Sequence, residues 1–223
     1  MRTNTQDRIA AGRSVNAVRA TTAAFGVYAG LLGIEHGFLE TLHGNVATKG
    51  LKIMAADFEL PFPFGHEPAM TVIPNFLVTG VAAMMVGLAI LVWSAGFVQR
   101  KHGALVLLLL SIALLLLGGG FGPISLMIVA CMAAAMIGSP LTWWRVYLPD
   151  ALRRFLAAIW LWSLGGALLW VPGEFVAGQI LGLKNDHRQI LTNLNLMLSY
   201  PMLALFVLTL ITGFAHEAER HRE

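Results

Sequence analysis

Long apolar stretches separated by short polar segments run through the whole sequence. There are six of them, and each is close to the ~20 residues that a helix needs to cross a membrane. Their approximate limits are residues 18–42, 69–97, 103–119, 122–144, 151–171 and 190–213. The pattern predicts an all-α, polytopic integral membrane protein, a six-helix bundle that forms a single transmembrane domain over residues 1–223.

The third and fourth stretches form one continuous apolar run, GALVLLLLSIALLLLGGGFGPISLMIVACMAAAMIG, at residues 103–138. A single helix of 36 residues would be about 54 Å long, whereas the hydrocarbon core of a membrane is about 30 Å thick. The triple glycine at 118–120, followed by Gly122 and Pro123, interrupts the run with residues that favour a turn. We therefore expect two helices joined by a tight hairpin.

Composition and charge agree with this prediction and give it an orientation. The chain is 57% hydrophobic and 12% charged, whereas a soluble domain is about 25% charged. With six spans and the N-terminus inside, the inner segments hold eleven Lys and Arg residues and the outer segments four, as the positive-inside rule requires. Counting the hairpin as one span gives about eight against seven. We therefore expect both termini on the cytoplasmic side.

Four glycines share one face of the first predicted helix. Gly26, Gly30, Gly33 and Gly37 are spaced four, three and four residues apart, which places them in a stripe about 60° wide. Glycines spaced in this way let another helix approach closely. Packing within the chain explains the stripe, and the alternative is a contact with a second copy or with a partner in a larger membrane complex.

The same helix ends in GLLGIEHGFLETLHGN, residues 30–45, where polar side chains join the glycines. His36, Glu40 and His43 follow at i, i+4 and i+7 in a second stripe beside the glycine face. Imidazole and carboxylate groups suit a divalent transition metal such as zinc, iron, copper or manganese. The sequence GHEP then brings His66 and Glu67 back to the same side of the membrane as further candidate ligands.

Two other interpretations of these residues stay open. One is a site for a proton or a polar ligand without metal, and the other is a structural network of hydrogen bonds between helices. His43 lies beside Gly44, a candidate C-terminal cap, where a cation is favourable. His36 lies about two turns below the helix end, where a charge costs at least a few kcal/mol and marks a functional site.

Further polar residues are expected near the outer side of the membrane. Glu35 points about 100° away from His36, so we assign it to a different environment. Together these residues predict a polar pocket that opens outward, and the alternative for Asn193 and Asn195 is hydrogen bonding between helices. The predicted pocket residues are Glu35, Asn75, Glu174, His187, Asn193, Asn195 and Ser199.

Several function classes lack their sequence signals. The chain contains no nucleophile elbow, histidine-rich hydroxylase box or phosphate-binding loop, so we expect no nucleotide and rank an enzyme below other functions. Haem is not expected, because only His36 lies clearly within a span. Cys131 is the single cysteine, so no CxxC redox pair exists. The net charge of +3 arises from residues at helix ends, and we expect no nucleic-acid partner.

The segment HEPAMTVIPNFLVTG, with GIEHGFLE before it and GGGFGP after it, resembles a pattern in small multi-pass bacterial membrane proteins of unassigned function. The resemblance covers roughly residues 25–140. It implies the cytoplasmic (inner) membrane of a bacterium. It implies no activity, ligand or catalytic residue.

The sequence favours a protein that binds, and on one interpretation translocates, a small ligand or metal cation in an outward-facing pocket. His36, Glu40 and His43 are the expected principal contacts. The first alternative is an accessory or assembly subunit that packs against a larger membrane complex through its glycine face. The second is a membrane enzyme that uses a metal in the pocket for hydrolytic or redox chemistry.

Overall fold

A computed structural model describes residues 16–55, 68–180 and 188–220. Between residues 171 and 199 it describes the helical backbone but only a few of the side chains. The described residues form seven helices and one small antiparallel sheet of two strands. The helices are α2 (Ala17–Thr41), α3 (Phe76–Gly96), α4 (Gly103–Leu116), α5 (Phe121–Ala135), α6 (Thr142–Tyr147), α7 (Asp150–Ile180) and α8 (Arg188–Arg220). The strands are β1 (Lys52–Met54) and β2 (Pro68–Met70).

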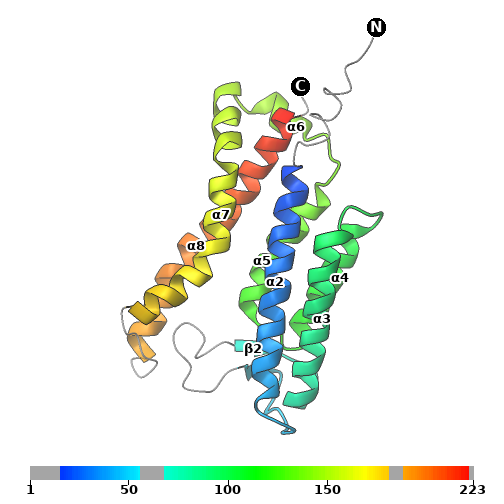
Figure 1. Cartoon of the computed structure of the whole chain (residues 1–223), viewed down its shortest axis with the longest axis vertical. Coiled ribbons are helices and arrows are strands. Elements are labelled where there is room, and N and C mark those ends of the chain that lie inside the picture. Colours follow the sequence, from blue (N-terminus) through cyan, green and yellow to red (C-terminus); the bar gives the residue numbers. More distant parts are fainter. Residues whose placement is uncertain (1–15, 56–67, 181–187, 221–223) are drawn as a thin grey trace.

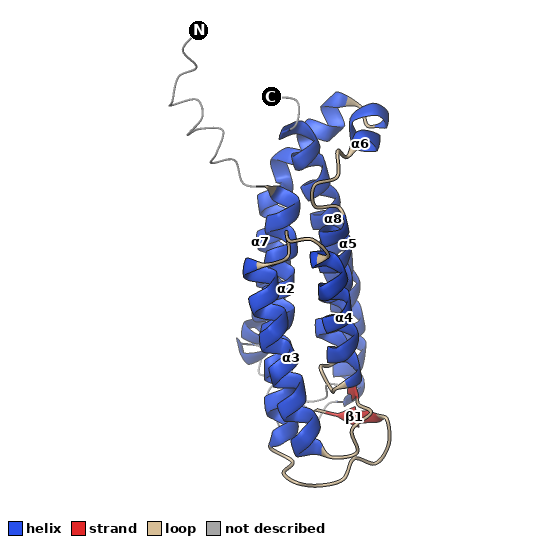
Figure 2. Ribbon diagram, turned by 90° about the vertical axis from the view of Figure 1, so that its right-hand side faces the viewer, coloured by secondary structure: helices blue, strands red, loops and turns tan. Residues whose placement is uncertain are grey.

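The long helices lie along one axis and form an elongated bundle (Figures 1 and 2). α2 begins and α8 ends at the end of the bundle that carries α6, which we call the α6 end, and the two strands lie at the opposite end, the sheet end (Figure 1). α2 packs most extensively against α3 and also contacts α5, whereas α7 packs mainly against α8. The α7–α8 pair lies beside α2 near the α6 end and leans away from it toward the sheet end (Figure 1).

Four of the described helices are long and apolar enough to cross a membrane: Ala17–Thr41, Phe76–Gly96, Asp150–Trp170 and Tyr200–Arg220. Large apolar side chains cover the outside of the bundle, as expected of surfaces that face lipid; they include Val78, Val81, Met85 and Leu88 of α3 and Leu105, Leu108, Leu109 and Ile112 of α4. The chain is therefore a helical, multi-pass membrane protein.

The two helices of the predicted hairpin are shorter than a complete span. α4 has 14 residues and α5 has 15, so they are about 21 and 22 Å long, against about 30 Å for the hydrocarbon core. The turn between them follows Leu116 and precedes Phe121, where the triple glycine was expected to break the apolar run. These lengths leave the predicted count of six spans without direct support.

The second apolar stretch differs most from its prediction. A helix was expected from about residue 69, but α3 begins at Phe76 and residues 68–70 form β2 instead. Pro74 disfavours helical backbone in the residue before it, and the Asn75 side chain accepts a hydrogen bond from the Val78 N–H, capping the helix. Residues 68–70 pair with β1, and Ala69 packs against Ile53 and Ala55 in a small apolar cluster.

The other helix ends also shift from the predicted limits. α5 ends at Ala135 rather than near 144, and Gly138, with a φ of +76°, precedes the separate short helix α6. α7 continues past Pro172 to Ile180, and α8 contains Pro201 in its interior. Membrane helices tolerate such prolines because neighbouring groups satisfy the carbonyls that lose their partners.

The glycine stripe of α2 packs against helices of the same chain. A Cβ atom on Gly30 would lie 2.7 Å from the Gly87 carbonyl oxygen, and one on Gly37 would lie 2.5 Å from the Gly80 carbonyl oxygen. Gly26 packs against the Ser94 side chain of α3, and Gly33 faces Leu114 of α4. Intrachain packing therefore accounts for the stripe, and a partner could use this face only if α2 separated from α3 and α4.

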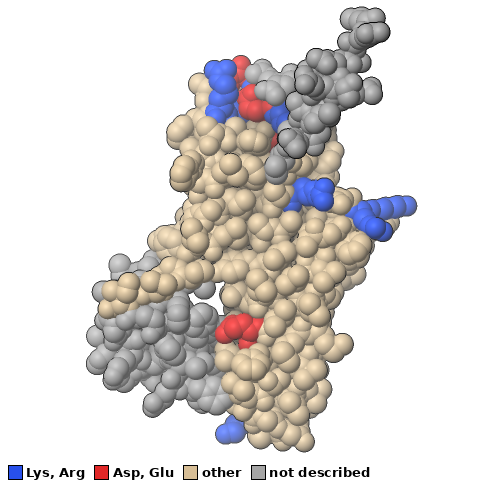
Figure 3. All heavy atoms as spheres, in the orientation of Figure 1, with Lys and Arg blue, Asp and Glu red and all other residues tan. Residues whose placement is uncertain are grey.

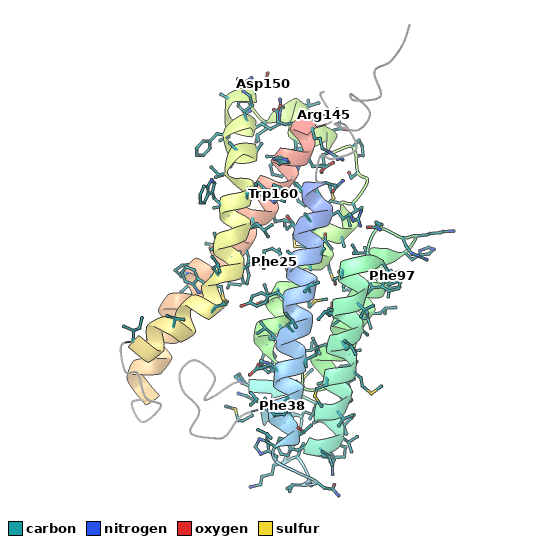
Figure 4. All side chains as sticks on the ribbon, viewed as in Figure 1. Phe25, Phe38, Phe97, Arg145, Asp150 and Trp160 are labelled. Carbon is teal, nitrogen blue, oxygen red and sulfur yellow. The ribbon has the colours of Figure 1, made fainter. Side chains whose placement is uncertain are left out.

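Charged groups tie the helices together at the α6 end, where Figure 4 shows Arg145 and Asp150. Arg153 is buried; its guanidinium donates to Asp150 at 2.7 Å and to Glu219 of α8. It also donates to the carbonyl oxygen of Arg145 at 3.2 Å. Lys and Arg side chains gather mainly in this half of the face drawn in Figure 3.

Glu217 of α8 makes a second link at the α6 end. Its carboxylate accepts hydrogen bonds from the Ala17 N–H at 3.0 Å and from the Asn16 side chain at 3.1 Å. Farther along α2, the Trp160 indole donates to Thr21 at 3.0 Å, and the rings of Phe25 and Phe206 meet at 5.4 Å (Figure 4). The described contacts of α2 with α7 and α8 thus concentrate in the half that carries α6.

Candidate functional site

The last two turns of α2 place two ionisable side chains inside the protein. His36 is 2% exposed and Glu40 is fully buried, and the two residues are one helical turn apart on the same face. Phe38, between them in sequence, points outward and is 53% exposed (Figure 4). The face that carries His36 and Glu40 therefore turns toward the interior of the bundle, away from lipid.

The turn between α4 and α5 packs directly against both side chains. A Cβ atom on Gly118 would overlap both carboxylate oxygens of Glu40, and one on Gly120 would overlap the imidazole of His36. Both glycines also have positive φ angles, +91° and +75°, which disfavour residues with a side chain. The triple glycine therefore makes room for the two site residues as well as forming the hairpin.

Hydrogen bonds hold this turn against the segment that follows β2 and against the first turns of α3. The Gly118 N–H donates to the Met70 carbonyl at 2.9 Å, and the Thr79 hydroxyl donates to the Leu117 carbonyl at 2.9 Å. The hydroxyls of Thr71 and Thr79 are themselves 2.5 Å apart, and both residues are buried. The α4–α5 turn that packs on Glu40 is therefore itself held by the end of β2, by the residues that follow it and by the start of α3.

Glu40 has an unusual electrostatic position. Neither carboxylate oxygen accepts a hydrogen bond from any residue that the structure describes, and both atoms are buried. Among the described residues, His36, one helical turn earlier on the same face, is the titratable side chain that interacts with it electrostatically. Burying an ionised carboxylate without a partner costs several kcal/mol, so such a group carries a proton or is balanced by a cation.

The imidazole of His36 has a defined orientation. Its Nδ1 lies 3.0 Å from the Leu32 carbonyl oxygen, which can only accept, so Nδ1 carries a hydrogen. Nε2 is then the basic nitrogen, and it faces Gly120. Anchoring one ring nitrogen on a carbonyl is how proteins orient a histidine that binds a metal or a proton through the other.

Glu35 lies closer to His36 than the helix geometry suggested. Its Oε2 atom is 3.1 Å from His36 Nδ1, although the Cβ atoms of the two residues point in different directions. The side chain of Glu35 is long enough to turn back along the helix, and it is 32% exposed. The assignment of Glu35 to a separate environment was wrong, and the residue forms a partly exposed edge of the site.

His43 has partners of its own. Its Nε2 lies 3.2 Å from the Ala55 carbonyl oxygen, and its ring stacks on Phe76 with centroids 4.3 Å apart. These contacts direct the ring toward the residue that follows β1 and toward the start of α3. No three His, Cys, Asp or Glu side chains of the described residues lie close enough together to hold a metal ion.

Of the remaining predicted site residues, the structure describes the side chain of one, Asn75. Asn75 caps α3 and also donates to the Asn45 side chain at 2.7 Å, which accounts for its polar group. His66, Glu67 and His187 lie outside the described residues, and so do the side chains of Glu174, Asn193, Asn195 and Ser199.

Sequence reasoning missed the contribution of the α4–α5 turn and of the two threonines. The triple glycine was a visible signal, but its spacing indicates only a turn. Nothing in the sequence connects Gly118 with Glu40, which lies 78 residues earlier. No family of proteins, curated protein or solved structure was found to match this chain.

Proposed function

We propose that this membrane protein binds a small cation at Glu40, with His36 beside it as the second functional group. The observation that carries this proposal is the full burial of the Glu40 carboxylate without a hydrogen bond from any described residue. Intramembrane acidic groups with no structural partner are typical of ion and proton sites. The proposed site is the set Glu40, His36 and the glycine turn 118–120.

That no described residue donates a hydrogen bond to Glu40 also argues against a purely structural role. A structural network would have Glu40 bonded to neighbouring helices, as Thr79 is bonded to the Leu117 carbonyl. The Thr71 and Thr79 hydroxyls nearby satisfy each other and the backbone instead. Glu40 is therefore a buried carboxylate both of whose oxygens lack a hydrogen bond from the described residues, which leaves its electrostatic requirement for a ligand to meet.

A transition metal is one form that the cation can take. Glu40 would supply a carboxylate oxygen and His36 its Nε2, which is a donor set that suits zinc, iron, copper or manganese. Zinc requires at least one further protein ligand, for which His66 and Glu67 are the candidates. Protonation of the imidazole at low pH would then release the metal.

We also propose six spans with both termini in the cytoplasm of a bacterium. Successive helices α2, α3, α4, α5, α7 and α8 reverse direction along the bundle (Figure 1), which supports α4 and α5 as short spans. The basic side chains at the α6 end support that end as the cytoplasmic one (Figure 3). The proposed site then lies in the outer half of the membrane and serves binding, or transport toward the α6 end.

The cation proposal is tested by measuring stability in detergent against pH and against added metal ions, for the native protein and for Glu40→Gln. A ligand that binds only the folded state stabilises it by about 2.7 kcal/mol at a hundred times its Kd. We expect the stability of the native protein to change with pH or with one added metal. In Glu40→Gln we expect this change in stability to be lost.

Asp150→Asn is the control, because it removes a carboxylate at the α6 end of the bundle, away from the site (Figure 4). This variant should keep the response. If native protein and Glu40→Gln respond identically to every cation and to pH, no cation binds at Glu40 and the proposal fails.

A further inference from the structure

We infer that α6 and the first turn of α7 bind the headgroups of anionic phospholipids in the membrane leaflet that surrounds the α6 end. The inference is independent of Glu40 and of which side of the membrane this end faces. Three observations lead to it: the exposed aromatic face of α6, two arginines whose charges no described residue balances, and a buried arginine that fixes α6 in place.

α6 presents an apolar, largely aromatic face to the outside of the protein. Trp143, Val146 and Tyr147 follow at i, i+3 and i+4, and each side chain is more than half exposed. The rings of Trp143 and Tyr147 contact each other, with centroids 5.9 Å apart. Tryptophan and tyrosine are enriched where a membrane meets water, because each ring is apolar and carries one polar N–H or O–H group. In a membrane protein, lipid is therefore the expected cover for this face.

The other sides of α6 differ from this face. The Trp144 ring packs on Phe214 of α8, with centroids 5.8 Å apart, so this side of the helix faces the protein. Arg145 lies about 200° around the helix axis from Trp143, on the side away from the aromatic face. A helix with an apolar side and a basic side is suited to lie in the plane of the membrane interface, where its basic side meets the headgroups.

Buried Arg153 fixes α6 in this orientation. Its guanidinium donates to the carbonyl oxygens of Trp144 and Arg145, at 3.4 and 3.2 Å, and is itself held by one carboxylate of α7 and one of α8. Both carbonyls belong to the last turn of α6, where helical N–H partners run out. The same contacts bring the backbone of Arg145 close to Arg153, which directly precedes Arg154 in α7.

The acidic side chains that the structure describes at this end are already engaged. They pair with Arg153 and Arg220 and are Asp150, Glu217 and Glu219. The side chains of Arg145 and Arg154 make no ion pair or hydrogen bond with a described residue, and Arg154 is exposed. A phosphodiester can supply the anion that these arginines lack, because a guanidinium donates two parallel hydrogen bonds to phosphate oxygens.

The lipid-facing surface of α7 reaches the same turn. Phe155 and Trp162 lie seven residues apart on one face of the helix, and both are more than half exposed. They belong to a segment long and apolar enough to cross a membrane, which begins at Asp150. Arg154 and α6 thus lie where this span enters the membrane, at the level of the lipid phosphates. The anion that these positions meet there is that of a phospholipid.

Quenching of tryptophan fluorescence by brominated lipids tests this inference with the full-length protein in vesicles. The vesicles contain phosphatidylcholine with a minor share of phosphatidylglycerol, and the bromine is placed on the acyl chains of one lipid at a time. The contribution of Trp143 is the difference between the native protein and Trp143→Phe, which keeps an aromatic ring on α6. We expect brominated phosphatidylglycerol to quench Trp143 several-fold more than its share of the lipid predicts.

The double variant Arg145→Gln with Arg154→Gln should reduce this quenching to the level that the share of phosphatidylglycerol predicts. Neither side chain has a described partner, so the double variant should remain folded. The matched control combines Arg19→Gln with Lys101→Gln, which removes the same charge at exposed positions at the start of α2 and before α4. The control should keep the native quenching, and each variant is measured with and without Trp143→Phe.

An equal loss in the two double variants would show a general attraction of anionic lipid to basic residues and would overturn the site. Quenching of Trp143 in the native protein that only follows the share of each lipid, or no quenching by either lipid, would also overturn it. Both leaflets of the vesicles contain phosphatidylglycerol, so the result does not depend on how the protein inserts. Every one of these outcomes leaves the proposal for Glu40 unaffected.

Discussion

Glu40 and Gly118 show how one residue without a side chain can define a site. The carboxyl group occupies the position that a Cβ atom at residue 118 would take. The site therefore requires a residue without a side chain at 118 as much as it requires the carboxyl group. Gly120 has the same relation to His36. A glycine in a turn is usually explained by its backbone angles, but here the neighbouring side chains impose a second requirement.

Gly118→Ala tests this second requirement, with Gly138→Ala as its control. Both glycines have positive φ, +91° and +76°, so both variants incur about 1–2 kcal/mol of backbone strain. No atom lies within 4 Å of a Cβ at Gly138. We expect Gly118→Ala to lose more stability in thermal unfolding and to lose the Glu40-dependent pH response. Equal losses in the two variants would show that strain alone matters.

Individual residues also show where sequence reasoning is sufficient and where it fails. The helical spacing of His36 and Glu40 correctly predicts that they share a face, because the backbone fixes the direction of each Cβ. It fails for Glu35, whose flexible side chain returns to His36, and it does not specify the partners of His43. Side-chain rotamers and contacts with distant segments decide these cases, and neither is encoded in local spacing.

At the level of elements, α2 and α3 form the most closely packed pair. Gly30 meets Gly87 and Gly37 meets Gly80, so the two contacts are seven residues apart in both helices. Each would-be Cβ lies within 3 Å of backbone atoms of the opposite helix, which cannot move aside as a side chain can. The close approach of the two backbones positions the end of α2 and its two site residues.

Leucine at position 30 or 37 should therefore separate the two helices. We expect Gly30→Leu and Gly37→Leu each to destabilise the protein by about 1–3 kcal/mol and to reduce the folded yield, measured by size-exclusion chromatography in detergent. Gly165→Leu is the matched control, because this glycine lies inside α7 with no atom within 4 Å of its Cβ position. Equal yields for all three variants would contradict the close α2–α3 contact.

Helix prediction succeeded where the pattern was local and failed where it depended on distant partners. The first helix was expected at 18–42 and is found at Ala17–Thr41. The start of α3 was placed about seven residues early, because residues 69–73 are mostly apolar and look like a continuation of the helix. Their backbone groups instead pair with β1 and with residues 116–118, contacts that hydrophobicity does not reveal.

For the molecule as a whole, the arrangement of helices predicts which segments reach which side of the membrane. Ala47 and Gln99 are both exposed. Ala47 lies in the segment between α2 and α3, and Gln99 follows the opposite end of α3. In a Cys131→Ser background, a membrane-impermeant thiol reagent added to intact cells should modify Ala47→Cys and leave Gln99→Cys unmodified.

Permeabilised cells supply the control, because both cysteines should then react. Ala55 is a poorer probe position, since it is fully buried against Ile53 and Ala69. Modification of Gln99→Cys in intact cells would reverse the proposed orientation and place Glu40 in the inner half of the membrane.

The segments that surround Glu40 also determine when during synthesis the site can form. The described groups that contact it or hold its covering turn come from α2, from residues 70–79 and from residues 116–120. The ribosome makes all of these before α7 and α8, and early segments of a chain can fold while later ones are still being made. Glu40 can therefore be covered while the nascent chain is still attached to the ribosome. Helices α7 and α8 then join a partly formed bundle whose ionisable group is already shielded from lipid.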